Sequence, residues 1–271
     1  MSDVILVNNL KKSYGKHTVL KGVTFSVRKG EIFALLGSNG AGKTTSLECL
    51  EGLKAYDGGS IEKHGTTGIQ LQSSSLPAHI KPCEAIRLFA KWKHAPVTEQ
   101  LLTSLGIHEF SKKQYRQLST GQKRRLHLAL ALIGDPDLLF LDEPTAGLDV
   151  EAKNALHDQI RSLKKQGKTI LLASHDMAEV EQLCDRIAIL HGGKIAFCGT
   201  IGELNRQIGT HCQILIQTQN GMETYESENL GETLLLLLTG YQRDGIAVLD
   251  LEVKKASLED QFLKIAKEGI L

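Results

Sequence analysis

The most informative stretch of this chain is Gly37-Ser38-Asn39-Gly40-Ala41-Gly42-Lys43-Thr44, which fits the pattern G-x-x-x-x-G-K-[ST] at every fixed position. It follows the apolar run Ile32–Leu36 and precedes Thr45–Leu50, so it joins an expected strand to an expected helix. Its glycines let backbone N–H groups wrap a phosphate, and the helix N-terminus adds partial positive charge. Lys43 would reach the β- and γ-phosphates of a nucleotide, and the Thr44 hydroxyl would hold Mg²⁺.

The composition is that of an ordinary globular protein. A length of 271 residues, 41% of them hydrophobic, accommodates one large domain or two small ones. The formal net charge of +1 gives no strong field toward nucleic acid or anionic lipid, so we expect no nucleic-acid partner. No segment approaches ~18 uninterrupted apolar residues, and Met1–Val4 lacks the parts of a signal peptide. The five cysteines form no C-x-x-C pair, which suits a reducing cytosol and argues against zinc.

Strands alternate with helices through about the first 200 residues, which indicates a parallel α/β core. Two short strands, Val4–Val7 and Val23–Val27, precede the glycine-rich loop, and the segment 73–117 reads as helical and polar-faced. The later expected elements are a buried strand at Asp137–Leu141, a helix capped by Asp149, a strand at Thr169–Ser174, a helix at Asp176–Cys184 and a hairpin turning at Gly192-Gly193.

The pattern changes around residue 200. The expected elements there are a strand at Cys212–Thr218, a turn at Asn220-Gly221, a strand at Met222–Glu226, a helix at Leu230–Thr239, a strand at Leu249–Val253 and a final helix capped by Ser257. The run Leu234–Leu238 is expected to be a buried helix face. We interpret 205–271 as a small α+β appendage; the alternative is a C-terminal extension of the same core.

Two carboxylates, Asp142 and Glu143, end the apolar strand that begins at Leu138. At the C-terminal end of a parallel strand they would face the phosphate site. Asp142 is then placed to bind Mg²⁺, directly or through water, and Glu143 to polarise the attacking water as general base.

A second anion site is expected at Leu118-Ser119-Thr120-Gly121-Gln122, which precedes the basic helical stretch Lys123–Leu128. A serine hydroxyl, free backbone N–H groups and the helix dipole favour an anion there. The alternative is ordinary capping of the helix by Ser119.

In this order, the motifs resemble those of the ATP-binding subunit of an ABC transporter: Gly37–Thr44, Gln72, Leu118–Gln122, Leu138–Glu143, Gly147-Leu148-Asp149 and His175. The five-residue stretch differs from the family's LSGGQ only in having Thr120. The likeness spans residues 4 to about 200. Two further stretches, Leu47–Leu53 and Ser257–Phe262, are similar to stand-alone ATPase subunits of bacterial drug and antibiotic exporters.

The resemblance implies a role for several single residues. Tyr14 would stack on adenine, and His175 would hydrogen-bond the γ-phosphate. Gln72 would touch Mg²⁺ or the attacking water; Gln70 competes for this role, because the family's usual proline is Leu71 here. Asp149 would cross the dimer interface. The implied nucleotide contacts are Tyr14, Gly37, Ser38, Asn39, Gly40, Ala41, Gly42, Lys43, Thr44, Thr45, Ser119 and Gly121.

The same resemblance implies an ATPase that energises a membrane transporter, with ATP and Mg²⁺ bound. Two copies, or one copy and a paralogous ATPase, would close head to tail over ATP. The permease would be a separate polypeptide docking on 73–117, with this subunit peripheral at the cytoplasmic face of the cell membrane. The implied fold is a P-loop NTPase core with an N-terminal antiparallel β subdomain and a short helical insertion over 1–204, and an α+β accessory domain over 205–271.

Two other functions remain open: a soluble ABC-type ATPase of DNA repair or translation, and a catalytically silent nucleotide-binding regulator. Repair types carry long coiled coils and translation types usually carry two ATPase domains, neither of which is evident here. Lys43, Glu143 and His175 count against a silent regulator. Trp92 lies among basic residues, as in single-strand nucleic-acid binding, but we expect a packed helix tryptophan.

Overall fold

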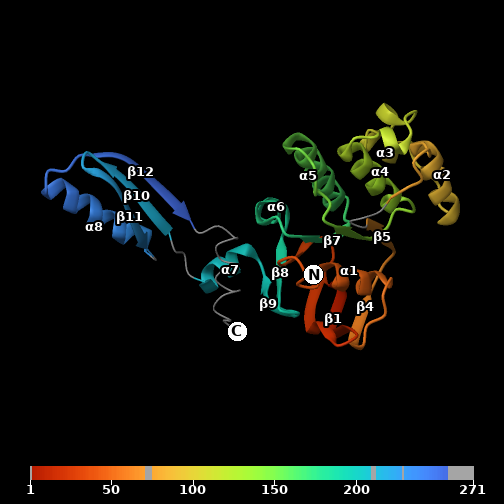
Figure 1. Cartoon of the computed structure of the whole chain (residues 1–271), viewed down its shortest axis with the longest axis horizontal. Coiled ribbons are helices and arrows are strands. Elements are labelled where there is room, and N and C mark those ends of the chain that lie inside the picture. Colours follow the sequence, from red (N-terminus) through yellow and green to blue (C-terminus); the bar gives the residue numbers. More distant parts are fainter. Residues whose placement is uncertain (1, 71–74, 209–211, 228, 256–271) are drawn as a thin grey trace. The chain divides into compact units, whose positions relative to one another are not determined.

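A computed structural model describes residues 2–70, 75–208, 212–227 and 229–255. The chain divides into two compact units, Met1–Cys198 and Gly199–Leu271 (Figure 1). The sequence placed a boundary between residues 204 and 205. Each unit is described by itself.

The first unit opens with an antiparallel sheet of three strands in the described residues. β1 (Asp3–Tyr14) lies between β2 (His17–Arg28) and β4 (Gly58–Lys63). Buried Val, Ile and Leu side chains of β1 and β2 face the core, whereas most of the residues between them are exposed. This alternation is what a sheet with one covered face requires, and it confirms the antiparallel β subdomain.

A second sheet, of six strands among the described residues, carries the phosphate loop. Its order is β5 (Thr67–Gln70), β6 (Leu138–Asp142), β7 (Thr169–Ser174), β3 (Ile32–Leu36), β8 (Arg186–His191) and β9 (Lys194–Gly199). The first five strands pair in parallel, and every residue of β3, β6 and β7 is buried. Continuous apolar runs are typical of parallel strands covered on both faces. The α/β core is confirmed.

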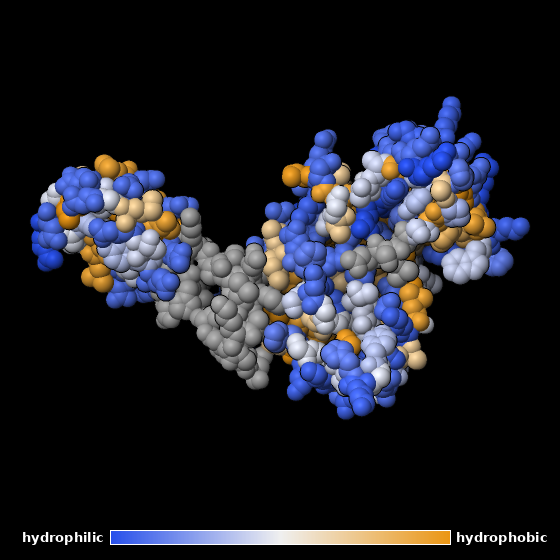
Figure 2. All heavy atoms as spheres, viewed as in Figure 1, coloured by the Kyte–Doolittle hydropathy of each residue, from blue (hydrophilic) through white to orange (hydrophobic). Residues whose placement is uncertain are grey.

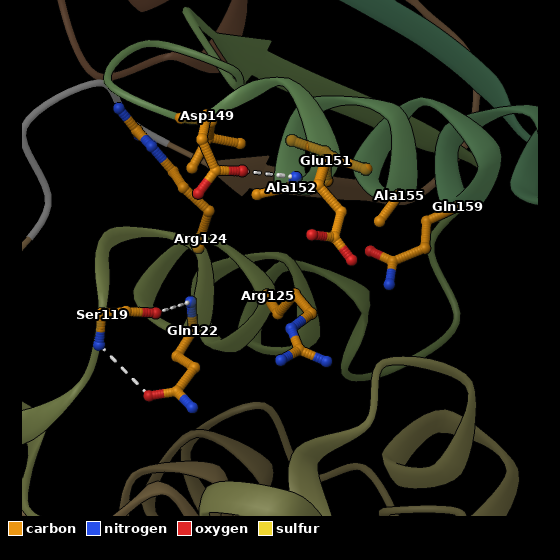
Figure 3. Close-up of a pocket in the computed structure, with 12 residues that line it drawn as sticks. Ser119, Gln122, Arg124, Arg125, Asp149, Glu151, Ala152, Ala155 and Gln159 are labelled. Atoms are coloured by element: carbon orange, nitrogen blue, oxygen red, sulfur yellow. Dashed lines mark hydrogen bonds between the residues drawn. The ribbon is translucent and has the colours of Figure 1, made fainter.

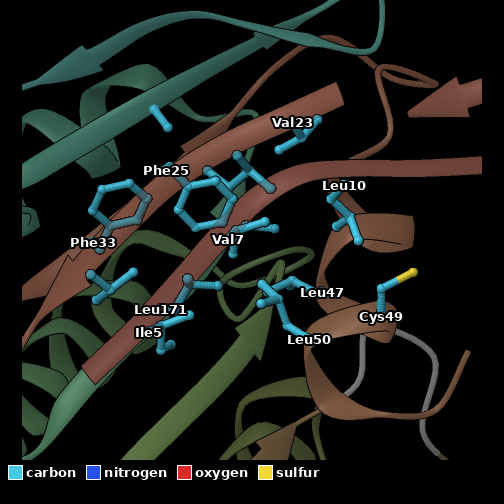
Figure 4. Close-up of a cluster of buried hydrophobic side chains, with 14 of the residues drawn as sticks. Ile5, Val7, Leu10, Val23, Phe25, Phe33, Leu47, Cys49, Leu50 and Leu171 are labelled. Carbon is cyan, nitrogen blue, oxygen red and sulfur yellow. The ribbon is translucent and has the colours of Figure 1, made fainter. Parts of the chain in front are cut away.

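The core of the first unit joins the two sheets to α1 (Lys43–Glu51) (Figure 4). Phe25 of β2 stacks on Phe33 of β3, with the ring centroids 5.4 Å apart. Leu47 and Leu50 of α1 are buried in the same cluster. Burial of each leucine contributes about 1.5–3 kcal/mol to folding. Because β3 and α1 share this core, the loop between them is anchored at both ends.

Helices occupy the rest of this unit in the described residues: α2 (Pro82–Trp92), α3 (Glu99–Ser104), the 3₁₀ turns η1 (Ile107–Phe110) and η2 (Tyr115–Gln117), α4 (Thr120–Leu132), α5 (Val150–Lys165) and α6 (Met177–Leu183). No helix in the described parts is long and apolar enough to cross a membrane.

The expectation that Trp92 is packed was wrong. Its side chain is 72% exposed at the end of α2, and Leu88, one turn earlier, is 57% exposed. The ring meets only Phe89 edge-on among the aromatic side chains of the described residues, at 6.0 Å. The inward face of α2 is already filled by Ala85 and Ile86, so the second apolar stripe of this helix points outward.

The second unit begins with α7 (Ile201–Ile208) and contains a sheet in the order β11 (Gly221–Ser227), β10 (Cys212–Thr218), β12 (Val248–Lys255). Helix α8 (Leu230–Arg243) packs on it through Tyr241, Leu234 and Leu237. Leu235 and Leu236 are more than two-thirds exposed, so the run Leu234–Leu238 is not a buried face throughout. Successive helix residues turn by about 100°, and α8 is covered on one side only. The helix expected from Ser257 lies outside the described residues.

Candidate nucleotide-binding and hydrolysis site

Two glycines of the phosphate loop have a steric reason to be glycine. A Cβ at Gly37 would lie 2.6 Å from the carbonyl oxygen of Leu190. Gly42 caps α1 with a φ of 107°, in the left-handed region, and a Cβ there would lie 2.7 Å from Leu20 Cδ2. The backbone can therefore turn tightly from β3 into α1, as the glycine pattern predicted.

Lys43 is folded back onto its own loop. Its Nζ donates to the carbonyl oxygens of Gly37, at 2.8 Å, and Ser38, at 3.3 Å, and lies 3.9 Å from a carboxylate oxygen of Glu143. Burial lowers the pKa of Lys43, while the charges of Glu143 and Asp142 oppose that shift. The ammonium group thus sits inside the loop, where terminal phosphates would meet it.

Asp142 and Thr44 present oxygen atoms side by side. Burial raises the pKa of Asp142, and a hydrogen bond from the Thr44 side chain partly offsets this shift. Asp142 Oδ1 is buried and has no hydrogen-bond partner in the described parts of the chain. One carboxylate and one hydroxyl suit Mg²⁺, which takes few protein oxygens and completes its shell with phosphates and water. Accordingly, no group of three His, Cys, Asp or Glu suited to a metal occurs among the described residues.

Gln72 lies outside the described residues. Gln70 ends β5 and is 2% exposed. Its amide nitrogen and oxygen have no partner within the described residues, and its neighbour on β6 is Leu141.

Glu143 links the phosphate loop to His175. It has a φ of 47°, uncommon for a residue other than glycine, and its N–H donates to the Ala173 oxygen at 3.0 Å. One carboxylate oxygen faces Lys43 and the other lies 2.8 Å from His175 Nδ1. Such backbone strain clusters at functional sites. The structure therefore brings the expected base, the loop lysine and the expected histidine into one chain of contacts.

Tyr14 lies at the end of β1 and is 44% exposed. Two ammonium groups lie over its ring, Lys12 Nζ at 5.4 Å and Lys54 Nζ at 5.3 Å from the centroid. Lys12 also pairs with Asp57, and Lys54 with Glu48. Neither lysine was predicted from the sequence; the position of Lys12, two residues before Tyr14 on the same strand, was the available signal.

Ser119 caps α4, as the alternative interpretation predicted (Figure 3). Its Oγ accepts the Gln122 N–H at 3.2 Å, and its own N–H donates to Gln122 Oε1 at 3.1 Å. This is a capping box. Gly121 also has a local role, because a Cβ there would lie 3.3 Å from Ala152 Cβ on α5.

A cavity of about 350 Å³ opens between the start of α4 and α5. Asp149, which caps α5 by accepting the Ala152 N–H at 2.8 Å, lines it together with Ser119 and Gly121 (Figure 3). None of the residues lining this cavity belongs to the phosphate loop. The expected site residues thus form two groups, one around Lys43 and one around Ser119.

Arg124 is a residue that the sequence analysis passed over as part of a basic stretch. Its Nη2 donates to the Ala146 carbonyl oxygen at 3.4 Å, in the loop after Glu143. Burial lowers the pKa of the Arg124 guanidinium, and the negative charges of Asp142 and Glu143 oppose that shift. Its spacing within a run of three cations gave no signal for this contact.

A phosphate loop between β3 and α1, with acidic residues at the end of parallel strand β6, defines a P-loop nucleotide hydrolase. Residues 20–146 match the family described as ABC transporter.

Several proteins are similar to this chain. Nod factor export ATP-binding protein I of Ralstonia nicotianae is 38% identical over 70% of this chain, which spans 65% of that protein. Linearmycin resistance ATP-binding protein LnrL of Bacillus subtilis is 35% identical over 76% of this chain and 72% of its own length. A solved ATP-binding subunit of an ABC transporter is 29% identical, with a TM-score of 0.68, over 75% of this chain and 92% of that one.

This chain belongs to the ABC transporter family. It is an ATP-binding subunit whose activity is ATP hydrolysis coupled to transport.

Proposed function

We propose that this chain drives export through a separate permease by closing two copies head to tail over ATP. The observation that carries the proposal is the separation of the two residue groups. No residue of the phosphate loop lines the cavity at Ser119, Gly121 and Asp149, which supports a second copy bringing this cavity to an ATP bound at Lys43. Such an arrangement makes two equivalent sites related by a two-fold axis. A paralogous ATPase could take the place of one copy.

The contacts around Glu143 support its role as general base. Its carboxylate would accept a proton from the attacking water, and His175 Nδ1, at 2.8 Å, would orient that carboxylate. The other ring nitrogen of His175 would then hydrogen-bond the γ-phosphate. Lys43 moves from the loop carbonyls to the β- and γ-phosphates, where its charge stabilises the transition state. Thr44, Asp142 and Gln72 would hold Mg²⁺, which would neutralise phosphate charge.

Tyr14 supports adenine binding, because its half-exposed ring offers a stacking surface. The neighbouring ammonium groups of Lys12 and Lys54 hold the ring in place through cation–π contacts of about 0.5–1 kcal/mol each at exposed sites.

The permease docks, in this proposal, on the helical insertion at 73–117. Leu88 and Trp92 form an exposed apolar stripe on α2, and apolar side chains gather around α2 in Figure 2. Exposed aromatic anchors are typical of protein interfaces. The subunit would then be peripheral at the cytoplasmic face of the cell membrane. Trp92 is the chain's only tryptophan, so a blue shift of its fluorescence on adding permease in detergent would support this site.

Export as the direction is supported by the two curated relatives, one named for Nod factor export and one for linearmycin resistance. We assign the ATP-binding domain to residues 1–204 and the accessory domain to 205–271. A break between compact units at Cys198 supports a boundary in this region.

Light scattering of Glu143→Gln tests the sandwich dimer. This variant keeps the size of the side chain and removes the base, so Mg²⁺-ATP should convert monomers into stable dimers and ADP should not. The matched control is Glu143→Gln combined with Lys43→Ala, which should stay monomeric. A Glu143→Gln protein that binds ATP and stays monomeric at high concentration would contradict the proposal.

A further inference from the structure

A buried hydrogen bond joins η2 to α4 below the Ser119 cap. The Tyr115 hydroxyl and His127 Nε2 are 2.8 Å apart, and the two rings meet edge to face at 5.7 Å. Both residues are less than a tenth exposed. This buried pair favours one arrangement of η2 and α4, because separating the two side chains would leave buried polar atoms without hydrogen-bond partners.

The bond is one between neutral groups. Burial, together with the charges of Arg124 and Lys123, lowers the pKa of His127 to about 4. Burial raises the pKa of the Tyr115 hydroxyl. The pair therefore keeps the same protonation state across the physiological pH range, and its role is one of position rather than of proton sensing.

The same tyrosine is tied to the segment 76–80, which follows Gln72 closely in the chain. The Tyr115 hydroxyl receives the backbone N–H of Leu76, and its own backbone N–H donates to the Ile80 oxygen at 2.9 Å. Arg116 adds a third bond, from its N–H to the Ala78 oxygen at 3.0 Å. The turn η2 therefore moves with this segment.

On its other side the pair is attached to the rest of the site through α4. Ser119 caps the start of this helix, two turns before His127, and Arg124 between them reaches the Ala146 oxygen beyond Glu143. Helix α4 has other directional contacts with the helical insertion: Lys93 Nζ donates to the Ala131 oxygen at 3.2 Å, and Arg125 pairs with Glu109 at 3.2 Å. Its buried Leu126 and Leu128 pack without such bonds.

We infer that Tyr115 and His127 are positioning residues that lock α4 to the segment 76–80. When the segment 76–80 moves, α4 then moves with it, and the start of α4 carries Ser119 and Gly121. The buried pair gives the two elements a directional contact through which their positions can be coupled. The inference rests on the proposed function, because its readout is the approach of Ser119 and Gly121 to ATP on a second copy.

Tyr115→Phe tests the inference, since it keeps the ring and removes the hydroxyl. In a Glu143→Gln background, ATP-driven dimerisation should weaken about tenfold, because the lost hydroxyl bonds both His127 and the Leu76 N–H. In the otherwise unaltered chain, kcat should fall while KM for ATP stays within about twofold of the wild type. ATP binding to single chains should not change, because the phosphate loop is untouched.

Two further variants separate position from stability. His127→Gln retains a side chain that can bond the hydroxyl, and it should dimerise better than His127→Leu. Tyr225→Phe is the matched control in the second unit, where the lost hydroxyl bonds Tyr241 at 2.9 Å; it should leave dimerisation unchanged.

The inference is overturned if Tyr115→Phe lowers only the melting temperature and leaves dimerisation and kcat intact. It is also overturned if His127→Leu and His127→Gln behave alike. A wild-type chain that hydrolyses ATP without dimerising would instead contradict the proposed function, so the two failures can be told apart.

Discussion

The phosphate-loop half of the site and the Ser119 half differ in how complete they are within one chain. Around Lys43 the partners are already in contact, with Glu143 lying between the lysine and His175. Around Ser119, the cavity of about 350 Å³ is lined by a helix cap, a glycine, Asp149 and two arginines, and by no residue of the phosphate loop. The contrast teaches that nucleotide binding and nucleotide-driven closure are separable properties, carried by different residues.

The largest effect should come from the first half. Glu143→Gln should lower ATP turnover about 10²–10⁴-fold, the usual contribution of a general base, while ATP affinity stays close to that of the wild type. Single-turnover kinetics measure this directly. Glu151→Gln, an equivalent change in the second half, is the control and should retain most activity. Near-normal hydrolysis by Glu143→Gln would show that Glu143 is not the general base.

Lys43→Ala should weaken ATP binding next most strongly. Each charge-assisted hydrogen bond to a terminal phosphate is worth about 1.5–3 kcal/mol, so the loss should exceed tenfold. Calorimetry with ATP gives the affinity, and Lys153→Ala, outside this half, serves as the control. Unchanged affinity would mean that Lys43 is a structural clamp for the loop carbonyls only.

Ser119→Asp should break the second half while leaving the first half intact. Aspartate caps helices as well as serine does, but its charge would repel an approaching γ-phosphate. Monomeric ATP binding should persist, and ATP-driven dimerisation in a Glu143→Gln background should fall about tenfold or more. Ser119→Ala is the control for the cap and should cost about 1 kcal/mol of stability. This substitution is cleaner than Gly121→Asp, whose Cβ would crowd Ala152.

If Ser119→Asp dimerises as readily as the unaltered serine, the start of α4 is a helix cap and nothing more. The first half would then have to close over ATP against some other surface.

The smallest effect concerns a buried acid behind the phosphate loop. Burial, with the charges of Asp142 and Glu48, raises the pKa of Glu51 to about 7. A folded-state pKa above the unfolded one means that stability is full below pH 4.5 and declines as pH rises toward about 7. Glu51→Gln should therefore be more stable than the wild type at pH 8, by about 1 kcal/mol after allowance for partial exposure. Urea unfolding at pH 5 and pH 8 measures the difference; equal stabilities at both would contradict it.

The sequence predicted most of the first unit because its signals are local. Glycines at fixed spacing, all-apolar strands and the Asp149 cap each follow from the chemistry of adjacent residues. The exposed positions of Trp92, Leu235 and Leu236 could not be predicted in this way. Periodicity shows that a helix has an apolar stripe, but not whether a second layer covers it.

Contacts between distant segments were also beyond the sequence. Lys54 meets Tyr14 and Arg124 reaches Ala146 across separations that no spacing rule describes. Lys12 is different, because it lies two residues before Tyr14 on one strand and so shares its face. For Ser119 the sequence offered two interpretations, of which capping is confirmed and anion binding stays a prediction.

The capping bond at Ser119 leaves the proton of the hydroxyl uncommitted to that bond. In the cap, Oγ uses a lone pair to accept the Gln122 N–H. A hydroxyl carries one hydrogen as well as two lone pairs, so the same oxygen can donate while it accepts. Rotation about the Cβ–Oγ bond would therefore let the serine donate a hydrogen bond to an arriving phosphate while α4 stays capped. Alanine loses both capacities and aspartate keeps only the lone pairs, which makes serine the residue among these three that serves helix and anion at once.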